Sequence, residues 1–202
     1  MNRTDLLRAI AEKGYDVGFG AKKHFATYDI IDKAPGLIGF LSMAYGVLSL
    51  VVANPSAEIT SAVLIVLGIM GLYISFHDHK KTEYESAGRT LTELCNELKA
   101  LYFVVKSKED EKVEQKLVDR LSEIESRYYS KCISSQILFS NWYAHYKFYW
   151  EHQIGWINEQ LNFSFFRDKV PLSLWGALII VVITFVCRLL GDVTWVCDAL
   201  PK

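Results

Sequence analysis

The sequence predicts an all-α integral membrane protein with a transmembrane helical hairpin, a long cytoplasmic helical stalk or bundle, and a third, C-terminal transmembrane helix. Three observations support this class. Of the 202 residues, 51% are hydrophobic and 22% are charged, and the mean hydropathy of +0.14 is high for a soluble domain. Three segments are long enough to cross a bilayer and contain at most one charge each. Between Phe76 and Val170 there is no proline, and glycine occurs only at Gly88 and Gly155, which indicates helix.

Residues 1–34 are predicted to form an N-terminal cytoplasmic amphipathic helix. This segment is polar and carries six basic residues before the first apolar run, which argues against a cleavable signal peptide. Its apolar positions form one stripe: Leu7, Ile10, Val17, Ala21, Tyr28 and Ile31.

Residues 35–76 are predicted to form the transmembrane hairpin. The stretches "PGLIGFLSMAYGVLSLVVA" and "ITSAVLIVLGIMGLYISF" contain no charge, and the short connection "NPSAEI" allows only a tight turn. Lysines flank the hairpin at Lys33, Lys80 and Lys81, whereas the connection has none. Because basic flanks are retained in the cytoplasm, the N-terminus and both ends of the hairpin are predicted to be cytoplasmic.

Residues 77–170 are predicted to be the cytoplasmic helical stalk. A heptad seam predicts helix pairing or oligomerisation: Tyr84, Ala87, Leu91, Leu94, Leu98, Leu101 and Val105. The charge cluster "KSKEDEK" is expected to turn the chain, and a returning helix has its own stripe: Val113, Leu117, Leu121, Ile124 and Tyr128.

Residues 171–202 are predicted to form a third membrane helix and a short outer tail; whether this segment crosses completely stays open. Arg188 is the only charge inside a span. An ionisable residue in a membrane is a functional hypothesis by default, but Arg188 lies near the outer end, where snorkelling toward the interface is the simpler interpretation.

Small residues recur on one face of each hairpin helix. They are Gly39, Ser42, Gly46 and Ser49 in the first helix and Ser61, Gly68, Gly71 and Ser75 in the second. Small side chains let membrane helices approach closely. Two interpretations agree with this pattern: the two faces meet inside the hairpin, or one of them lines a pore in an oligomer. Both interpretations hold if one face packs inside the hairpin and the other lines the pore.

The stretch "SNWYAHYKFYWEH" predicts an amphipathic helix with an aromatic face that includes Trp142, Tyr146, Tyr149 and Trp150. This face is expected to pack on the stalk and to run into the inner membrane interface, as a joint between stalk and spans. A shared metal site is not expected, because His145 and His152 would lie roughly 10.5 Å apart along the helix axis. Base stacking is disfavoured because Lys147 is the only basic residue near these rings.

The sequence contains no signature of an enzyme, and we expect no catalytic residue, cofactor or metal. It has no phosphate-binding loop, dinucleotide fingerprint, nucleophile elbow or zinc-protease motif. Lys and Arg total 22 against 23 Asp and Glu, so no basic excess is available for duplex nucleic acid. The four cysteines form no CxxC pair and are expected to be unreactive; a disulfide between Cys187 and Cys197 would require the chain to reverse at Gly191.

The layout resembles a known family. A basic amphipathic helix that leads into "PGLIGFLSMAYGVLSLVV", the short-loop hairpin, the helix "HDHKKTEYESAGRTLTELCNELKAL" and the aromatic "NWYAHYKFYWEH" are similar to the SLATT family of two-transmembrane effectors, which are associated with bacterial SMODS and SLOG nucleotide-signalling systems. The resemblance covers Arg3 to Leu161. It implies a bacterial inner-membrane protein that oligomerises and breaches the membrane when a partner makes or senses a nucleotide signal. The third span departs from the two-span core.

Two hypotheses for function remain. In the first, the chain is a pore-forming antiviral effector whose stalk senses a cyclic nucleotide or a partner protein and shifts the hairpins. In the second, it is a membrane-anchored coiled-coil scaffold that recruits cytosolic proteins. Release of dye or ions from liposomes distinguishes the two.

Overall fold

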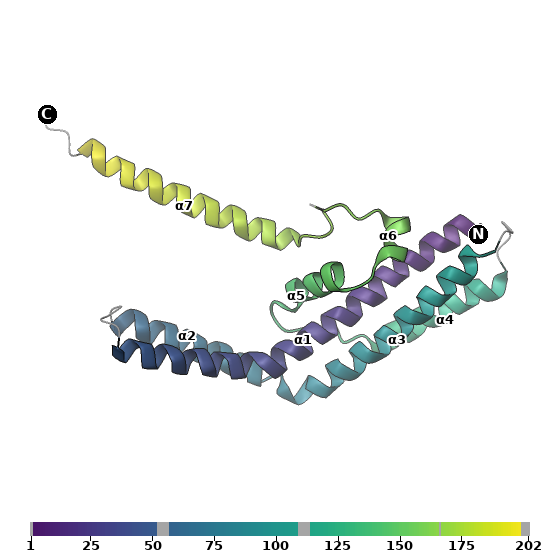
Figure 1. Ribbon diagram of the computed structural model, residues 1–202, viewed down its shortest axis with the longest axis horizontal. Coiled ribbons are helices and arrows are strands. Elements are labelled where there is room, and N and C mark those ends of the chain that lie inside the picture. The colour runs from purple at the N-terminus through teal and green to yellow at the C-terminus, as the bar shows by residue number, and fades with distance from the viewer. Residues whose placement is uncertain (1, 52–56, 109–113, 166, 199–202) are drawn as a thin grey trace. The chain divides into compact units, whose positions relative to one another are not determined.

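The computed structural model describes residues 2–51, 57–108, 114–165 and 167–198, and it describes only the backbone at residue 57 and at residues 189–198. All regular secondary structure in these ranges is helical, as predicted. The chain divides into two compact units, residues 1–162 and residues 163–202. The first unit contains α1 to α6, and the second contains α7 (Figure 1).

The first unit is built on an antiparallel pair of helices, α1 (Arg3–Val51) and α3 (Lys81–Lys106). At one end of the pair, Arg3 donates hydrogen bonds to the carbonyl oxygens of Val105, at 3.1 Å, and Lys106, at 2.5 Å. At the other end, Lys81 forms an ion pair with Asp32. Figure 1 shows α3 running along the first half of α1.

Two buried seams meet in this pair. Every residue of the predicted heptad seam of α3 is buried, including Leu91, Leu94, Leu98 and Leu101. The facing stripe of α1 is also buried: Leu7, Ile10, Gly14, Val17, Ala21, His24, Thr27 and Ile31. Predicted helix pairing is therefore confirmed, and the partner helix is α1 of the same chain. The seam residues of α3 are therefore buried within one chain.

A third helix, α4 (Gln115–Lys131), packs on α3. Of its predicted stripe, Leu117 and Ile124 are buried, and Leu121 and Tyr128 are half-buried. Arg120 and Arg127 both bond to the Glu97 carboxylate, at 2.8 and 2.9 Å. The predicted turn at "KSKEDEK" lies partly outside the described residues, and Val113 lies outside them.

The aromatic segment is not the single helix that the sequence predicts. It comprises α5 (Ser140–Tyr146), a π-helical turn η2 (Lys147–Glu151) and α6 (Gly155–Leu161), with a break at His152. The π-turn adds about one residue to its turn, so the side chains after it point in other directions than in a regular α-helix. The preceding segment, Cys132–Phe139, is also non-helical.

This change of backbone alters which face is buried. Ser140 and Ala144, which a regular helix would place opposite the aromatic face, are buried. Tyr146 and Trp150, which were predicted to pack, are 54% and 62% exposed. The predicted aromatic face is therefore wrong for these positions. Phe148 and Trp156 supply the buried rings instead, and they pack on α1 at Gly18 and Gly14.

The hairpin consists of the second half of α1 and α2 (Ala57–Ser75), which lie side by side in Figure 1. The Tyr45 and Thr60 hydroxyls are 3.2 Å apart, and Ile38 lies against Gly71. α1 continues through Pro35, although proline removes one helical hydrogen bond, to the Ile31 carbonyl. The predicted cytoplasmic helix and first span are thus one helix of 49 residues, roughly 74 Å long at 1.5 Å per residue.

Two helical stretches are long and apolar enough to cross a membrane. One lies within Arg3–Val51, with a mean hydropathy of 1.7, and the other within Glu58–Lys106, with a mean hydropathy of 2.2. Of the residues in these two apolar stretches, 0% and 6% are buried. A core helix of a soluble protein would be mostly buried, so this exposure favours membrane helices.

The second unit contains α7 (Leu172–Asp198). The part of α7 whose side chains are described, Leu172–Arg188, is a shorter apolar helix. The 310 turn η1 (Asp78–Lys80) of the first unit links α2 to α3.

Candidate functional site

The candidate site is the place where the helical bundle of the first unit passes into the hairpin, which we call the junction. One buried apolar cluster joins its parts: Ile31 of α1, Ile74 of α2, Tyr84 of α3 and Ile137 of the non-helical Cys132–Phe139 segment. Each of the four is at most 6% exposed. This cluster therefore connects the bundle to the ends of both hairpin helices.

A buried hydrogen-bond network fixes the Cys132–Phe139 segment to α1. Nε2 of His24 accepts the backbone N–H of Ile133 at 3.1 Å, and the Thr27 hydroxyl donates to Oε1 of Gln136 at 2.5 Å. The Tyr84 hydroxyl donates to the Ser135 carbonyl oxygen at 2.7 Å. A segment without helical hydrogen bonds needs such partners for its polar groups, because unsatisfied buried groups are costly.

These contacts determine the protonation state of His24. Its Nδ1 lies 2.7 Å from the Gly20 carbonyl oxygen, which can only accept, so Nδ1 carries the proton and Nε2 is free to accept from Ile133. Burial lowers the pKa of His24, and the neighbouring Lys23 charge acts in the same direction, against the hydrogen bond to Gly20. The neutral imidazole is the form that the network holds.

A largely buried ion pair lies beside this network. The Asp29 carboxylate of α1 binds Lys147 of the π-turn and, at 2.7 Å, the exposed Lys33. The Lys147 ammonium also lies 4.7 Å from the centre of the Tyr143 ring. Burial acts to raise the pKa of Asp29, but the two lysines outweigh it and the pKa is lowered. The carboxylate is therefore ionised and links the aromatic segment to α1.

The junction also contains an apolar cavity of about 270 Å³. Its walls come from α1 (Ile30, Ala34, Leu37, Ile38, Leu41), from α2 (Met70, Tyr73, Ile74) and from the Cys132–Phe139 segment (Ile137, Leu138, Phe139). None of the described side chains that line it is charged. Phe139 has a φ of 66°, in the left-handed region that a residue with a bulky side chain rarely adopts.

The structure places most of the predicted small residues away from the hairpin interface. A methyl group added at Gly39, Gly46 or Gly68 would meet nothing within 4 Å, and Ser61 and Ser75 are exposed. Among these residues, Gly71 faces α1, and Ser42 and Ser49 are half-buried. The interpretation that the two small-residue faces meet inside the hairpin does not agree with these contacts, since the open faces point outward.

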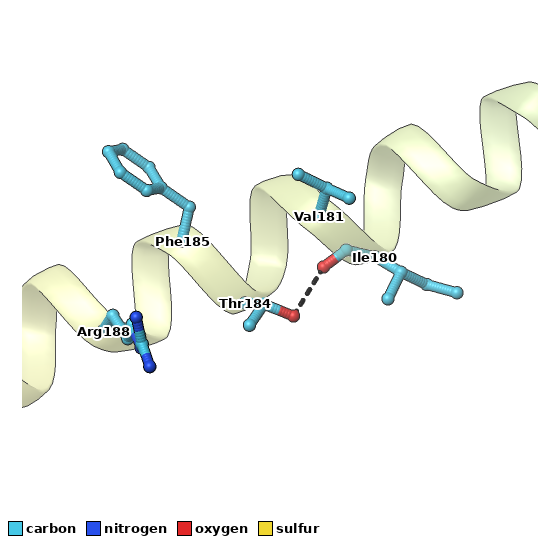
Figure 2. A pocket seen from close by; sticks show the side chains of 5 residues that line it. All are labelled: Ile180, Val181, Thr184, Phe185 and Arg188. Atoms are coloured by element: carbon cyan, nitrogen blue, oxygen red, sulfur yellow. Dashed lines mark hydrogen bonds between the residues drawn. The ribbon is translucent and has the colours of Figure 1, made fainter. Parts of the chain in front are cut away.

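Arg188 lies on α7, in the second unit. Together with Ile180, Val181, Thr184 and Phe185 it lines a shallow surface pocket, and all five residues belong to one helix. Figure 2 shows the Thr184 hydroxyl bonded to the Ile180 carbonyl oxygen, at 2.8 Å, one turn before Arg188. Cys187 is exposed, and a disulfide between Cys187 and Cys197 falls outside the described residues, which do not include the Cys197 side chain.

The comparisons with known proteins agree with this architecture. The family model of the SMODS and SLOG-associating 2TM effector domain 6 matches residues 1–178, which include both hairpin helices and the complete junction. The chain belongs to the SLATT family. A search of curated proteins and a search of solved structures each gave no match.

The SLATT match confirms the family that the sequence resembles and extends it from Leu161 to residue 178, within α7. This SLATT protein is accordingly a membrane effector associated with SMODS and SLOG signalling systems. The members of the SLATT family are generally non-catalytic. Within the described residues, no three His, Cys, Asp or Glu side chains are grouped so that they could hold a metal ion.

Sequence reasoning placed the joint between stalk and spans at Trp142, Tyr146, Tyr149 and Trp150. In the structure Tyr149 is buried and Trp142 is half-buried, but the contacts that join the bundle of this SLATT protein to its hairpin come from Cys132–Phe139 and its partners on α1, α2 and α3. One signal was available in the sequence: His24 and Thr27 are polar residues in the α1 seam, where buried polar groups require partners from another segment.

Proposed function

We propose that this SLATT protein is the pore-forming effector of a bacterial antiphage system, which oligomerises and permeabilises the inner membrane when a cyclic nucleotide or a partner protein activates it. The observation that carries the proposal is the continuity of α1. Its first half forms the core of the bundle, and its second half is a hairpin helix, with no flexible linker between them.

This continuity supplies a mechanical route from a cytoplasmic signal to the membrane. A ligand that favours one arrangement of the bundle over another shifts the equilibrium between them. Because α1 is one helix and the junction cluster includes Ile74 of α2, that shift displaces both hairpin helices.

Outward-facing glycines support assembly in the membrane. Gly39 and Gly46 on α1 and Gly68 on α2 have open space beside them within the described chain. Close approach at small residues is the usual means of packing membrane helices, so these faces are suited to contact with other copies. In the proposed pore, the small-residue faces that carry Ser42, Ser49, Ser61 and Ser75 line the path.

The proposed topology has a cytoplasmic N-terminus, a cytoplasmic bundle and a third crossing by α7. Lys33, Lys80 and Lys81 lie on the same side of the hairpin, as the positive-inside rule requires for a cytoplasmic face. In this arrangement Arg188 approaches the outer interface, where its long side chain reaches polar headgroups.

The scaffold hypothesis loses its main support. It requires a free coiled-coil seam for recruiting cytosolic proteins, but Leu91, Leu94, Leu98 and Leu101 are buried against α1.

Release of a trapped dye from liposomes tests the proposal. Purified protein would be reconstituted and exposed to a panel of cyclic dinucleotides and trinucleotides, and fluorescence dequenching would be recorded. We expect one nucleotide to stimulate release, and we expect Gly46→Leu to reduce it because the added side chain obstructs the open face. Val47→Leu, at an exposed neighbouring position, is the matched control. If no condition gives release while a stable complex with a cytosolic partner forms, the pore proposal should be abandoned.

A further inference from the structure

The apolar cavity of the junction has the lining and position of a site for a hydrocarbon chain. Its volume of about 270 Å³ is near the lower end of ligand pockets, which span roughly 300–1,000 Å³. The described lining residues are aliphatic and aromatic, and among them Tyr73 alone carries a side-chain polar group. A nucleotide requires donors and cations for its phosphates, so this cavity is unsuited to the signal molecule itself.

The cavity opens toward the surface that the hairpin presents to lipid. Leu37 and Leu41 of α1 and Met70 of α2 line it, and all three are also among the exposed hydrophobic residues of the two apolar helices. Its inner wall is different, because Ile74 and Ile137 are only 6% and 3% exposed. The cavity therefore runs from the lipid-facing surface into the junction cluster.

The backbone at Phe139 is a second, independent observation. A left-handed φ is unfavourable for a residue with a bulky side chain, and such strain persists only where the surroundings enforce it. Leu138 and Phe139 line the cavity, and 61% and 53% of their surfaces are exposed. Two large apolar side chains beside the end of a membrane hairpin are stabilised by contact with lipid.

We propose that the junction cavity binds an acyl chain of an inner-leaflet phospholipid, and that Leu138 and Phe139 enter the bilayer beside it. The bound chain contacts α1, α2 and the Cys132–Phe139 segment together. Lipid is therefore a structural ligand of the junction, in addition to being the solvent of the hairpin.

Photochemical labelling tests the proposal. The protein would be reconstituted in phosphatidylethanolamine and phosphatidylglycerol that include a phospholipid with a diazirine in its acyl chain. After irradiation, the labelled residues would be located by mass spectrometry. We expect label on Ile74 and Ile137, which bulk lipid reaches only through the cavity, as well as on Leu138 and Phe139.

Filling the cavity supplies the matched comparison. Ala34→Trp is expected to reduce labelling at Ile137 roughly fivefold, which corresponds to about 1 kcal/mol of binding free energy. Met43→Trp adds the same ring at an exposed position of α1 outside the cavity and should leave that labelling unchanged. Labelling of Ile65 and Ile69, which are exposed on α2, is the internal standard for both variants.

Labelling of the wild-type protein tests whether the cavity binds an acyl chain even if Ala34→Trp does not fold. Label confined to exposed residues such as Ile65 and Ile69, with none on Ile74 or Ile137, would overturn the proposal. So would chemical cross-links that place a second copy of this chain in the cavity in the absence of lipid labelling.

Discussion

His24 and Ile133 lie 109 residues apart, and Nε2 of His24 accepts the backbone N–H of Ile133 at 3.1 Å. This bond exists only while the imidazole is neutral, because a protonated Nε2 becomes a donor. The junction is therefore sensitive to the charge of one buried side chain.

Acidification should destabilise the first unit through His24. Burial lowers the pKa of His24 below its ordinary value of 6.5, so the unfolded chain binds a proton more readily than the folded one. The stabilising contribution is complete above pH 6.5 and is lost as the pH falls from 6.5 through the folded pKa. Thermal unfolding followed by circular dichroism at about pH 7.5 and at pH values below about 6 should show a lower Tm in acid.

His24→Gln is the variant that isolates this effect, since its amide oxygen can accept a hydrogen bond but does not titrate in this range. The variant should lose about 1 kcal/mol at neutral pH and show a weaker dependence on pH. Burial also lowers the pKa values of His145 and His152, so part of the dependence should persist. An unchanged acid sensitivity in His24→Gln would assign the effect to those two residues instead.

Gly14→Ala should destabilise the bundle by about 1–3 kcal/mol through overpacking. A Cβ at this position would lie 2.2 Å from Cη2 of Trp156, so the ring or the helix must move. Gly155→Ala is the matched control, because nothing lies within 4 Å of its added methyl group. Urea unfolding monitored by circular dichroism measures both variants; equal stability of the two would contradict the contact between α1 and α6.

Asp29 and Lys147 should show coupled effects in a double-mutant cycle. Asp29→Asn leaves the largely buried Lys147 ammonium without its counter-charge and should cost about 2 kcal/mol. This is less than the roughly 3–5 kcal/mol for breaking a fully buried pair, because both side chains keep some exposure. Lys147→Met should cost less, because Lys33 still neutralises Asp29. The double variant should be more stable than the sum of the single losses implies. Additive losses would mean that the two residues act independently.

Phe148→Ala should destabilise the first unit by about 3 kcal/mol or more, because it removes a ring that is 0% exposed and leaves a cavity. Trp150→Ala, two residues later, removes a larger ring that is 62% exposed and should cost distinctly less. Chemical unfolding of both variants tests the register of the π-turn. A greater loss for Trp150→Ala would favour the regular helix that the sequence predicts.

Cys95 should be a reporter of separation between α1 and α3. Burial raises the pKa of its thiol to about 11, against the opposing effect of Lys22 and Lys99. At neutral pH the reactive thiolate is therefore scarce. A maleimide should modify Cys95 slowly in the resting protein and faster when an activating nucleotide opens the bundle. The Cys132→Ser/Cys187→Ser/Cys197→Ser variant would remove the signal of the other thiols. Rapid modification without nucleotide would contradict the closed bundle.

The sequence was sufficient for features that depend on local pattern. The uncharged runs of the hairpin, the heptad of α3 and the stripe of α4 can be predicted from periodicity and length, because burial selects apolar side chains at helical spacing. The resemblance to the SLATT family rested on the same layout, and the family model confirms it.

The junction could not be predicted in the same way. The sequence indicates helix throughout Cys132–Phe139, but His24, Thr27 and Tyr84 provide hydrogen-bond partners that make a non-helical path stable. The aromatic face was misplaced for a related reason. One π-turn shifts Trp150 outward and Phe148 inward, and no local pattern in the sequence marks that turn.

By itself, the sequence determined the helical class, the apolar helices and the pairing seams, because these depend on hydrophobic spacing along one segment. Only the tertiary structure decided the partner of each seam, the outward orientation of Gly39, Gly46 and Gly68, and the path of Cys132–Phe139. These features depend on contacts between residues distant in sequence. A seam specifies that a helix must be covered, but only packing density and satisfied hydrogen bonds select the helix that covers it.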